Sequence, residues 1–261
     1  MKSFPHIIAI ILLALLTGCT KYQVPDGYPT TISKKSDDEL AGLRSDFSAR
    51  NKFVSSSIND FGFCDLVSDP VNPGIPPAAG IIDEKAAIGT VKDFAAENAD
   101  ETGITDTSKL TFSYKFTGTI YNGATEWYLG TKNQLIDTIE VLNSIILFHI
   151  VNGKVTYCSG NWYPDIYIPH NFNLSREKAL HKLEGKTVYH YTIIGAKYSE
   201  NITRQELDNS NINLKVLPVK DENSIKLYLC WMINIPAPAF YKMYVDVMTG
   251  DIIAEEPTII S

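Results

Sequence analysis

The sequence predicts an α+β protein with two small domains, each built from a helix packed on an antiparallel β-sheet. Two observations indicate this fold class. In each half of the chain, a segment with helical periodicity is followed by several runs with the alternating pattern of β-strands, and turn-forming residues separate these runs. Of the 261 residues, 44% are hydrophobic and 20% are charged, a globular composition with room for one large domain or two small ones.

Two segments are expected to form the helices of these domains. Residues 83–98 place apolar side chains at helical spacing on one face, after acidic residues that suit a helix N-terminus. Residues 176–183 follow Ser175, a favoured N-cap residue, and end at Gly185. A further short amphipathic helix is expected within residues 36–53.

The strands are expected to form antiparallel meanders. Residues 110–117 alternate apolar and polar side chains, which is typical of a strand with one buried face. Asn152 and Gly153 tolerate the positive φ values of a type I′ turn and therefore predict a hairpin. The remaining strands are predicted over residues 139–142, 144–151, 214–219, 225–235, 241–247 and 252–253.

The N-terminus resembles the signal peptide of a bacterial lipoprotein. Lys2 precedes an apolar run over residues 7–16, which is about half the length that a membrane-spanning helix requires. The run leads into Leu-Thr-Gly-Cys, which is similar to the lipobox whose cysteine receives a diacylglycerol. We therefore expect residues 1–18 to be removed and Cys19 to anchor the chain in the bacterial cell envelope, at the outer membrane or the periplasmic face. In the alternative, the protein is soluble and secreted and Cys19 is incidental.

Composition sets the expected boundaries between the parts of the mature chain. Residues 19–80 are interpreted as a tether and N-terminal segment, because residues 20–36 are polar and contain prolines. Residues 69–77 contain four prolines and exclude regular structure. The first domain is expected over residues 81–170 and the second over residues 171–261.

The sequence favours a binding protein over an enzyme. The net charge of −7, with no basic tract to offset it, disfavours binding to nucleic acid. The histidines do not form the HExxH motif of zinc peptidases, and neither a G-x-S-x-G elbow nor a G-x-G-x-x-G loop occurs in the sequence. We therefore expect no catalytic residues, no metal and no cofactor.

Two groups of titratable residues have structural explanations. His181 lies beside Glu177 and Glu184 on the second predicted helix, as expected of a solvated helix face, and a metal site is the alternative. Asp246 and Asp251 flank a Thr-Gly pair and are expected to cap a turn, with calcium binding as the alternative.

Cys64, Cys158 and Cys230 are expected to be small buried apolar residues. In an oxidising compartment they allow at most one intramolecular disulfide, and the sequence leaves the pairing open. His149 lies in a predicted strand and is expected to be a hydrogen-bonded sheet residue.

Residues 133–162 resemble the fungalysin/thermolysin propeptide motif, abbreviated FTP. They contain a glutamine, a strand reading Ile-Glu-Val and a hairpin reading Asn-Gly-Lys-Val followed by Ser-Gly-Asn-Trp. Residues 137–141 depart from the Gly-Ile-Pro-Val strand that is usual in that motif.

The second half resembles a PepSY domain. The residues that carry this likeness are Leu-Ser-Arg-Glu-Lys-Ala-Leu at 174–180, Leu-Pro-Val at 217–219, and Tyr-Val-Asp-Val-Met-Thr-Gly-Asp-Ile-Ile at 244–253. Both motifs occur in the order found in the pro-regions of thermolysin-type metallopeptidases, and together they cover residues 81–256.

The resemblance implies a pro-domain-like function. In that family the pro-region helps the catalytic domain to fold and inhibits it until cleavage. The chain stops at Ser261, shortly after the last PepSY-like strand, so we expect no catalytic domain to follow. The implied protein is a non-catalytic envelope lipoprotein that inhibits or chaperones a metallopeptidase in trans. The alternative is a surface or periplasmic lipoprotein that keeps the fold and has a ligand-binding or structural role.

Three aromatic residues are candidates for the partner-binding surface. Trp162, Tyr163 and Tyr167 follow a glycine turn, and prolines interrupt the segment. Protein interfaces favour such residues because they bury a large area and carry a polar group. In the alternative, these rings pack the seam between the two domains.

Overall fold

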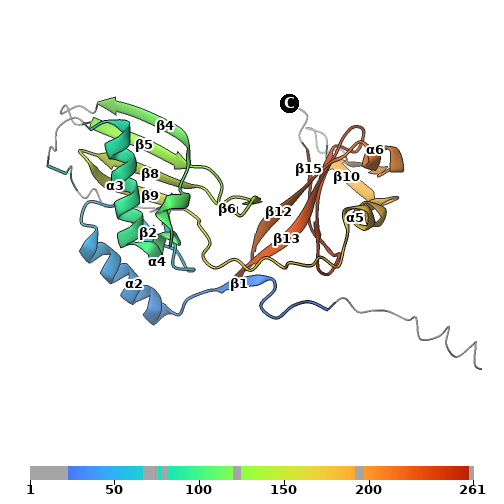
Figure 1. The fold of residues 1–261 in the computed structure, drawn as a ribbon, viewed down its shortest axis with the longest axis horizontal. Helices are drawn as coiled ribbons and strands as arrows, with labels where there is room; N and C mark the ends of the chain where they lie inside the picture. Colours follow the sequence, from blue (N-terminus) through green and yellow to red (C-terminus); the bar gives the residue numbers. More distant parts are fainter. Residues whose placement is uncertain are drawn as a thin grey trace, which may run out of the picture.

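The computed structural model describes residues 23–66, 74, 76–77, 82–119, 125–191 and 197–258. The described chain forms two lobes, one mainly from the first half of the sequence and one mainly from the second (Figure 1). Each lobe contains helices packed on a β-sheet, so the expected α+β class is confirmed. The predicted signal peptide and Cys19 lie outside the described residues.

The first lobe is a four-stranded antiparallel sheet with one helix-covered face (Figure 1). Its strands, in spatial order, are β4 (Phe112–Thr119), β5 (Thr125–Thr131), β8 (Ile146–Val151) and β9 (Lys154–Gly160). The predicted helix is α3 (Glu84–Glu97), and the carboxylate of Asp83 caps it by accepting a hydrogen bond from the Ala86 amide. The other elements of this lobe are α2 (Asp37–Arg50), β2 (Ser56–Ile58), β3 (Cys64–Leu66), α4 (Ala99–Thr102) and the 3-10 helix η1 (Thr107–Lys109).

The second lobe is built on a seven-stranded sheet. Its strands, in spatial order, are β15 (Ile252–Pro257), β14 (Tyr241–Asp246), β13 (Ser224–Ile235), β12 (Asn211–Lys220), β7 (Ile139–Val141) and β6 (Leu135–Ile136), while β1 (Thr30–Ser33) pairs with β13. The remaining elements are α5 (Arg176–Leu183), α6 (Arg204–Asp208), β10 (Thr187–Tyr191) and β11 (Lys197–Asn201). As predicted, Ser175 caps α5, and Gly185 follows the helix with a φ of 78°.

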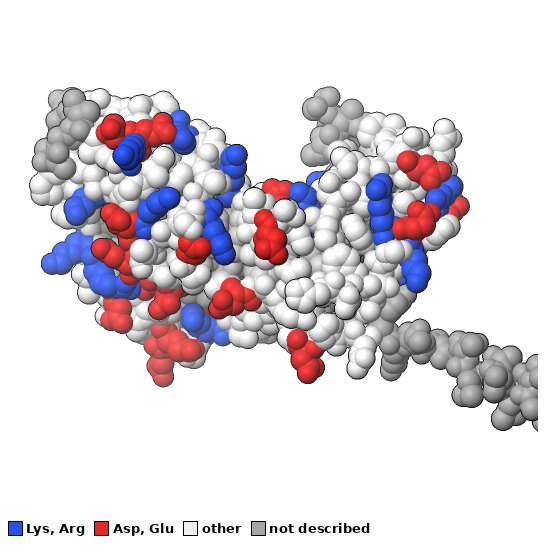
Figure 2. Space-filling view, in the orientation of Figure 1, with Lys and Arg blue, Asp and Glu red and all other residues white. Residues whose placement is uncertain are grey.

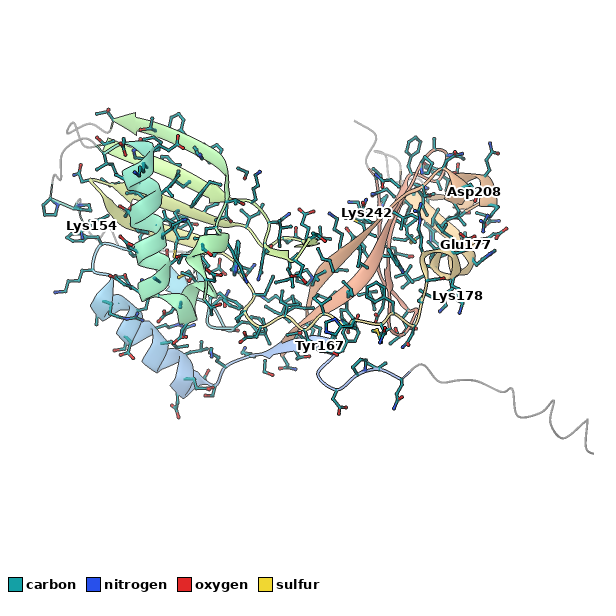
Figure 3. The ribbon with its side chains drawn as sticks, in the orientation of Figure 1. Lys154, Tyr167, Glu177, Lys178, Asp208 and Lys242 are labelled. Carbon is teal, nitrogen blue, oxygen red and sulfur yellow. The ribbon has the colours of Figure 1, made fainter. Side chains whose placement is uncertain are left out.

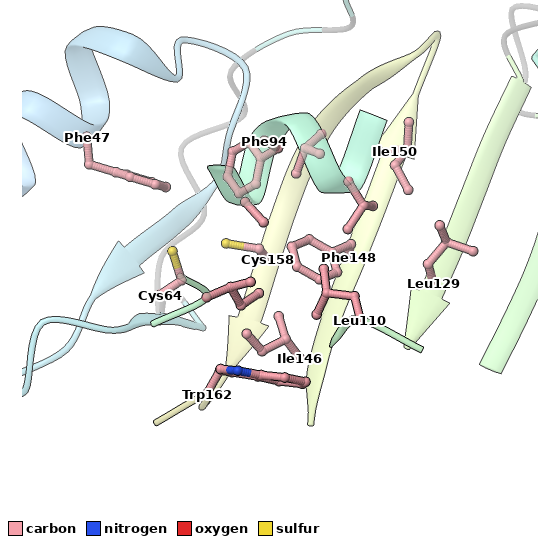
Figure 4. Packing of buried hydrophobic residues seen from close by; sticks show 14 of the residues in the cluster. Phe47, Cys64, Phe94, Leu110, Leu129, Ile146, Phe148, Ile150, Cys158 and Trp162 are labelled. Atoms are coloured by element: carbon pink, nitrogen blue, oxygen red, sulfur yellow. The ribbon is translucent and has the colours of Figure 1, made fainter. Parts of the chain in front are cut away.

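The core of the first lobe lies between α3 and the sheet (Figure 4). Phe94 of α3 meets Phe148 of β8 edge to face, with 6.3 Å between the ring centroids. It meets Phe47 of α2 in the same way at 6.4 Å, so α2 joins this core. Complete burial of side chains of this size stabilises the fold by roughly 1.5–3 kcal/mol each.

A hairpin from the first half of the sequence belongs to the sheet of the second lobe. The meander expected around residues 139–151 is therefore wrong for β7, which pairs parallel with β12, while β6 pairs antiparallel with β7. The turn between β6 and β7 places Asp137 at a φ of 55°, and Val141 of β7 is completely buried beside Val216 of β12. Burial of Val141 against the second lobe is the physical reason why β7 joins the sheet of that lobe.

A third core joins the two lobes. It collects Phe61 and Phe63 from the first lobe, Val216 and Leu229 from the second, and Tyr163 from the connecting segment. The two lobes thus have their own cores and also share one at their junction.

The expected tether over residues 20–36 is structured in its described part. Strand β1 pairs with residues 224–227 of β13, and Tyr28 just before it is only 8% exposed. The Tyr28 hydroxyl donates a hydrogen bond to Oδ1 of Asp246 over 2.6 Å and accepts one from the Leu229 amide over 3.0 Å. This segment is therefore part of the second lobe, because burying its tyrosine and pairing its strand stabilise it there.

No helix among the described residues combines the length and the hydrophobicity needed to cross a membrane.

Candidate functional site

The three aromatic residues proposed from the sequence lie in different environments. Trp162 is 5% exposed in the core of the first lobe. Tyr163 is 3% exposed in the shared core and meets Phe63 edge to face at 6.0 Å. Tyr167 is 40% exposed on the segment that connects the lobes (Figure 3). Of these residues, Tyr167 alone presents its ring to solvent, because the other two fill hydrophobic cores.

A β-bulge at Ser113 creates a different exposed aromatic surface. The pairing of β4 with β5 shifts by one residue between Phe112 and Tyr114, which leaves Ser113 without a partner in the register. One extra residue reverses the faces of all residues that follow it in the strand. Phe112 therefore packs against the core, whereas Tyr114 and Phe116 turn to the opposite face of the sheet and are 53% and 52% exposed.

The bulge also explains the position of Lys115. After the shift, this residue lies on the helix side of the sheet, and its Nζ contacts Oε1 of Glu84 in α3 at 2.6 Å. The prediction that Tyr114 and Phe116 belong to the buried face is wrong for this reason, although the strand itself is confirmed.

Six side chains form what we call the aromatic face, on the side of the four-stranded sheet opposite α3. Two rows cross the sheet. In one, Phe116 pairs with Tyr128, Tyr128 with His149, and His149 with Tyr157. In the other, Gly130 separates Tyr114 from Leu147. The aromatic face consists of Tyr114, Phe116, Tyr128, Leu147, His149 and Tyr157.

Side-chain contacts order the first row. The His149 ring stacks on the Tyr128 ring with 4.2 Å between centroids and 13° between planes. Tyr128 in turn lies 6.1 Å from Phe116 at a tilt of 45°. Burial and the neighbouring carboxylate of Glu126 raise the pKa of Tyr128, which favours its neutral form. The rings of Phe116, Tyr128 and His149 thus form a continuous strip.

His149 is fully hydrogen-bonded, as the sequence predicts. Its Nε2 lies 3.1 Å from Oε2 of Glu126, and its Nδ1 lies 3.1 Å from Oγ1 of Thr156. These contacts fix the orientation of the ring and hold it in its stack on Tyr128.

Gly130 brings the second row together. A Cβ atom at this position would lie 3.0 Å from Cδ2 of Leu147 and 3.2 Å from Cβ of Tyr114. Both distances are tighter than ordinary packing, so glycine allows these two side chains to close over the backbone of β5. Tyr114 and Leu147 therefore lie close to the Gly130 backbone, one on each side.

Other titratable residues serve the fold. His181 is 60% exposed and lies 3.7 Å from Glu177 and 3.6 Å from Glu184, as expected of a solvated helix face. Asp246 caps the turn after β14 by accepting hydrogen bonds from the Met248 amide and the Thr249 hydroxyl. Within the described residues, no group of three His, Cys, Asp or Glu side chains is arranged to hold a metal ion.

The three cysteines are buried, as predicted. Contact with Cys158 and then burial raise the pKa of the Cys64 thiol well above its ordinary value. Burial and the charge of Asp246 do the same for Cys230. As free thiols, Cys64 and Cys230 therefore favour the protonated form and are shielded from solvent.

Charges on the visible face of the molecule are mixed. Figure 2 shows Lys and Arg interspersed with Asp and Glu over both lobes, and the outline is notched between them. A hollow of about 450 Å³ lies between α2 and β2, and its lining includes Phe47, Val54 and Ile58.

Comparisons with known proteins identify no family. No model of a known protein family matches the chain, and no curated protein matches it significantly. Among solved structures, the Bacillus megaterium YpeB C-terminal domain is similar over 87% of this chain and 99% of that domain, with 11% sequence identity and a TM-score of 0.30.

Proposed function

We propose that this chain is a non-catalytic binding protein of the bacterial cell envelope, anchored by lipid on Cys19, whose aromatic face docks a protein partner. The aromatic face is the observation that supports this function. Tyr114, Phe116 and Leu147 are each at least half exposed, and they lie side by side on one sheet surface. Contiguous exposed apolar surfaces of this kind mark interaction sites in soluble domains.

The chemistry of the face suits a protein surface. Tyrosine, phenylalanine and histidine rings present large apolar areas, and Tyr128 adds a hydroxyl within 3.4 Å of Oε2 of Glu126. The stacked ring of His149 limits the entropy that the face loses on binding. Aromatic anchors of this type commonly supply the central energy of an interface.

We further propose that the partner is a metallopeptidase, inhibited or assisted in folding by this chain in trans. The support for this step is the resemblance of residues 133–162 and 174–253 to the pro-region of thermolysin-type peptidases. We place this peptidase on a separate chain, and the resemblance to a pro-region extends to both lobes.

The test is inhibition of a thermolysin-type zinc peptidase from the same organism by the purified mature chain. We expect inhibition at equilibrium, and we expect the variant Phe116→Ser/Tyr128→Ser to lose at least tenfold in inhibition constant. Truncating an aromatic anchor at an interface costs about 2 kcal/mol or more, which corresponds to roughly 30-fold in affinity. The two side chains are 52% and 37% exposed, so the variant should keep the fold.

The matched control is Tyr189→Ser/Tyr198→Ser on the β10–β11 hairpin of the second lobe. These rings are 45% and 48% exposed but lie outside the aromatic face, so inhibition should be unchanged. Equal inhibition by the two double variants would contradict docking on the aromatic face. No binding of the wild-type chain to any metallopeptidase of its organism would reject the peptidase partner and favour the alternative of a ligand-binding or structural lipoprotein.

A further inference from the structure

Two of the three buried cysteines face each other in the core of the first lobe. Cys64 on β3 is 2% exposed and Cys158 on β9 is fully buried. The neighbouring Cys158 side chain is the largest cause of the raised pKa of the Cys64 thiol. Figure 4 shows the two sulfur atoms turned toward one another beside Phe94.

Backbone contacts hold the strands of these cysteines together. Ser56 on β2 donates a hydrogen bond from Oγ to the Cys158 carbonyl over 2.6 Å and accepts one from the Cys158 amide over 2.8 Å. The Ser55 amide donates to the Thr156 carbonyl over 2.8 Å. Because Ile58 of β2 pairs directly with Cys64 of β3, the hairpin carries Cys64 to the edge of β9. Strand geometry, and not a chance approach of flexible side chains, sets their proximity.

The third cysteine lies elsewhere. Cys230 is completely buried on β13 in the second lobe, in a cluster with Leu217 and Tyr244. It therefore has no access to either of the other two sulfur atoms in the folded chain.

We propose that Cys64 and Cys158 form an intramolecular disulfide in the mature protein and that Cys230 remains a thiol. The proposal rests on the envelope location given under Proposed function, because disulfides persist in oxidising compartments. The bond forms by exchange with the disulfide of an envelope thiol oxidoreductase or of glutathione. The two cysteine sulfurs give up one electron pair as the S–S bond forms, and the donor disulfide takes that pair and both thiol protons and leaves as two thiols.

The structure also sets when the exchange occurs. The thiolate is the attacking species, and the raised pKa of Cys64 makes thiolate scarce once the core has closed. Oxidation therefore precedes closure of the first lobe. The finished bond then lies out of reach of reductants, as in a structural disulfide. It encloses the segment from α3 to β8, and all six residues of the aromatic face lie between the two cysteines in the sequence.

The experiment is a disulfide map of the mature chain. The chain is refolded from denaturant in a glutathione redox buffer, denatured, alkylated with N-ethylmaleimide and digested without reduction for mass spectrometry. We expect a peptide that joins Cys64 to Cys158 and a maleimide adduct on Cys230. Adducts on Cys64, Cys158 and Cys230 together, or a link that includes Cys230, would overturn the proposal. Because refolding needs no envelope and no partner, this result is independent of the proposed function.

The chain taken from its native envelope, alkylated as cells are opened, gives the second measurement. A peptide that links Cys64 to Cys158 would support the disulfide in the cell. Maleimide adducts on Cys64, Cys158 and Cys230 would show that the disulfide does not form there. That outcome would not affect the proposal that the aromatic face docks a partner, which has its own test.

Variants separate a covalent bond from two packed thiols. Cys64→Ala, Cys158→Ala and the double variant should lower Tm by the same amount, about 10 °C, because any of them removes one long-loop disulfide. If the decrease in Tm of the double variant equals the sum of the decreases in the two single variants, the two side chains pack independently, which would contradict the bond. Cys230→Ala is the matched buried control and should keep the linked peptide.

Discussion

Replacing Tyr28 with phenylalanine tests how firmly the N-terminal segment is fixed to the second lobe. The hydroxyl of Tyr28 lies between two buried groups. It donates to Oδ1 of Asp246 over 2.6 Å and accepts from the Leu229 amide over 3.0 Å. Asp246 is 1% exposed, and burial followed by its hydrogen bond raises the pKa of Tyr28 far above the ordinary tyrosine value. The phenylalanine variant keeps the ring and removes both hydrogen bonds.

The expected loss follows from the groups that remain. A hydrogen bond to a charged partner contributes about 1.5–3 kcal/mol, and a buried amide left without an acceptor costs about 1–3 kcal/mol. Asp246 keeps its hydrogen bonds from the Met248 amide and the Thr249 hydroxyl, so its desolvation is only partly uncompensated. We expect Tyr28→Phe to lower the free energy of unfolding by about 2–4 kcal/mol, the two costs overlapping in part.

The assay is denaturant unfolding of the mature chain, monitored by tryptophan fluorescence. Tyr167→Phe is the control, because that ring is 40% exposed and its change should stay within about 0.5 kcal/mol. A double-mutant cycle with Asp246→Asn should give a coupling energy above about 1 kcal/mol. A loss below about 0.5 kcal/mol for Tyr28→Phe would refute the view that this hydroxyl fixes the segment.

Two further predictions concern the pH dependence of stability and the lipid anchor on Cys19. Burial raises the pKa of Tyr163 to about 12, whereas a tyrosine in the unfolded chain titrates near pH 10. Its contribution to stability is complete below about pH 10 and is lost as the pH rises toward about 12, at up to about 1.4 kcal/mol per pH unit. In denaturant unfolding, Tyr163→Phe should reduce the decline of the free energy of unfolding between about pH 10 and pH 12. An unchanged decline would contradict this role of Tyr163. For Cys19→Ala, mass spectrometry of the N-terminus should show loss of acylation and fractionation should show release from the membrane; the same unacylated species in both proteins would reject the lipobox.

Elements with strong local signals were predictable from the sequence. The capped helices α3 and α5 match their predictions because Asp83 and Ser175 fix where each begins. The hairpin at Asn152 and Gly153 also matches, since both residues have positive φ values of 49° and 74°. The pairing of short strands such as β1 and β7 has no comparable local signal, because it depends on residues far away in the sequence.

The aromatic face was not predicted from the sequence because of a single residue, Ser113. The alternation of Leu110, Phe112, Tyr114 and Phe116 predicts one buried face, and the bulge at Ser113 divides that set between two faces. The position of Lys115 in the structure shows the same shift. Lys115 would lie on the solvent side of an unbroken strand, yet it reaches Glu84 at the start of α3. Nothing in local sequence distinguishes the two registers, because the choice depends on the pairing with β5.

The docked N-terminal segment and the aromatic face together define how the proposed lipoprotein would present its partner site. Tyr28 is the ninth residue after Cys19, and a fully extended chain of that length spans at most about 30 Å. The second lobe, which holds Tyr28, is therefore kept close to the bilayer when Cys19 carries a lipid. The aromatic face lies on the other lobe, beyond the shared core that includes Phe63 and Tyr163. Loss of the Tyr28 contact would lengthen the effective tether without touching the face, so partner binding in solution should survive Tyr28→Phe even where the membrane-bound arrangement changes.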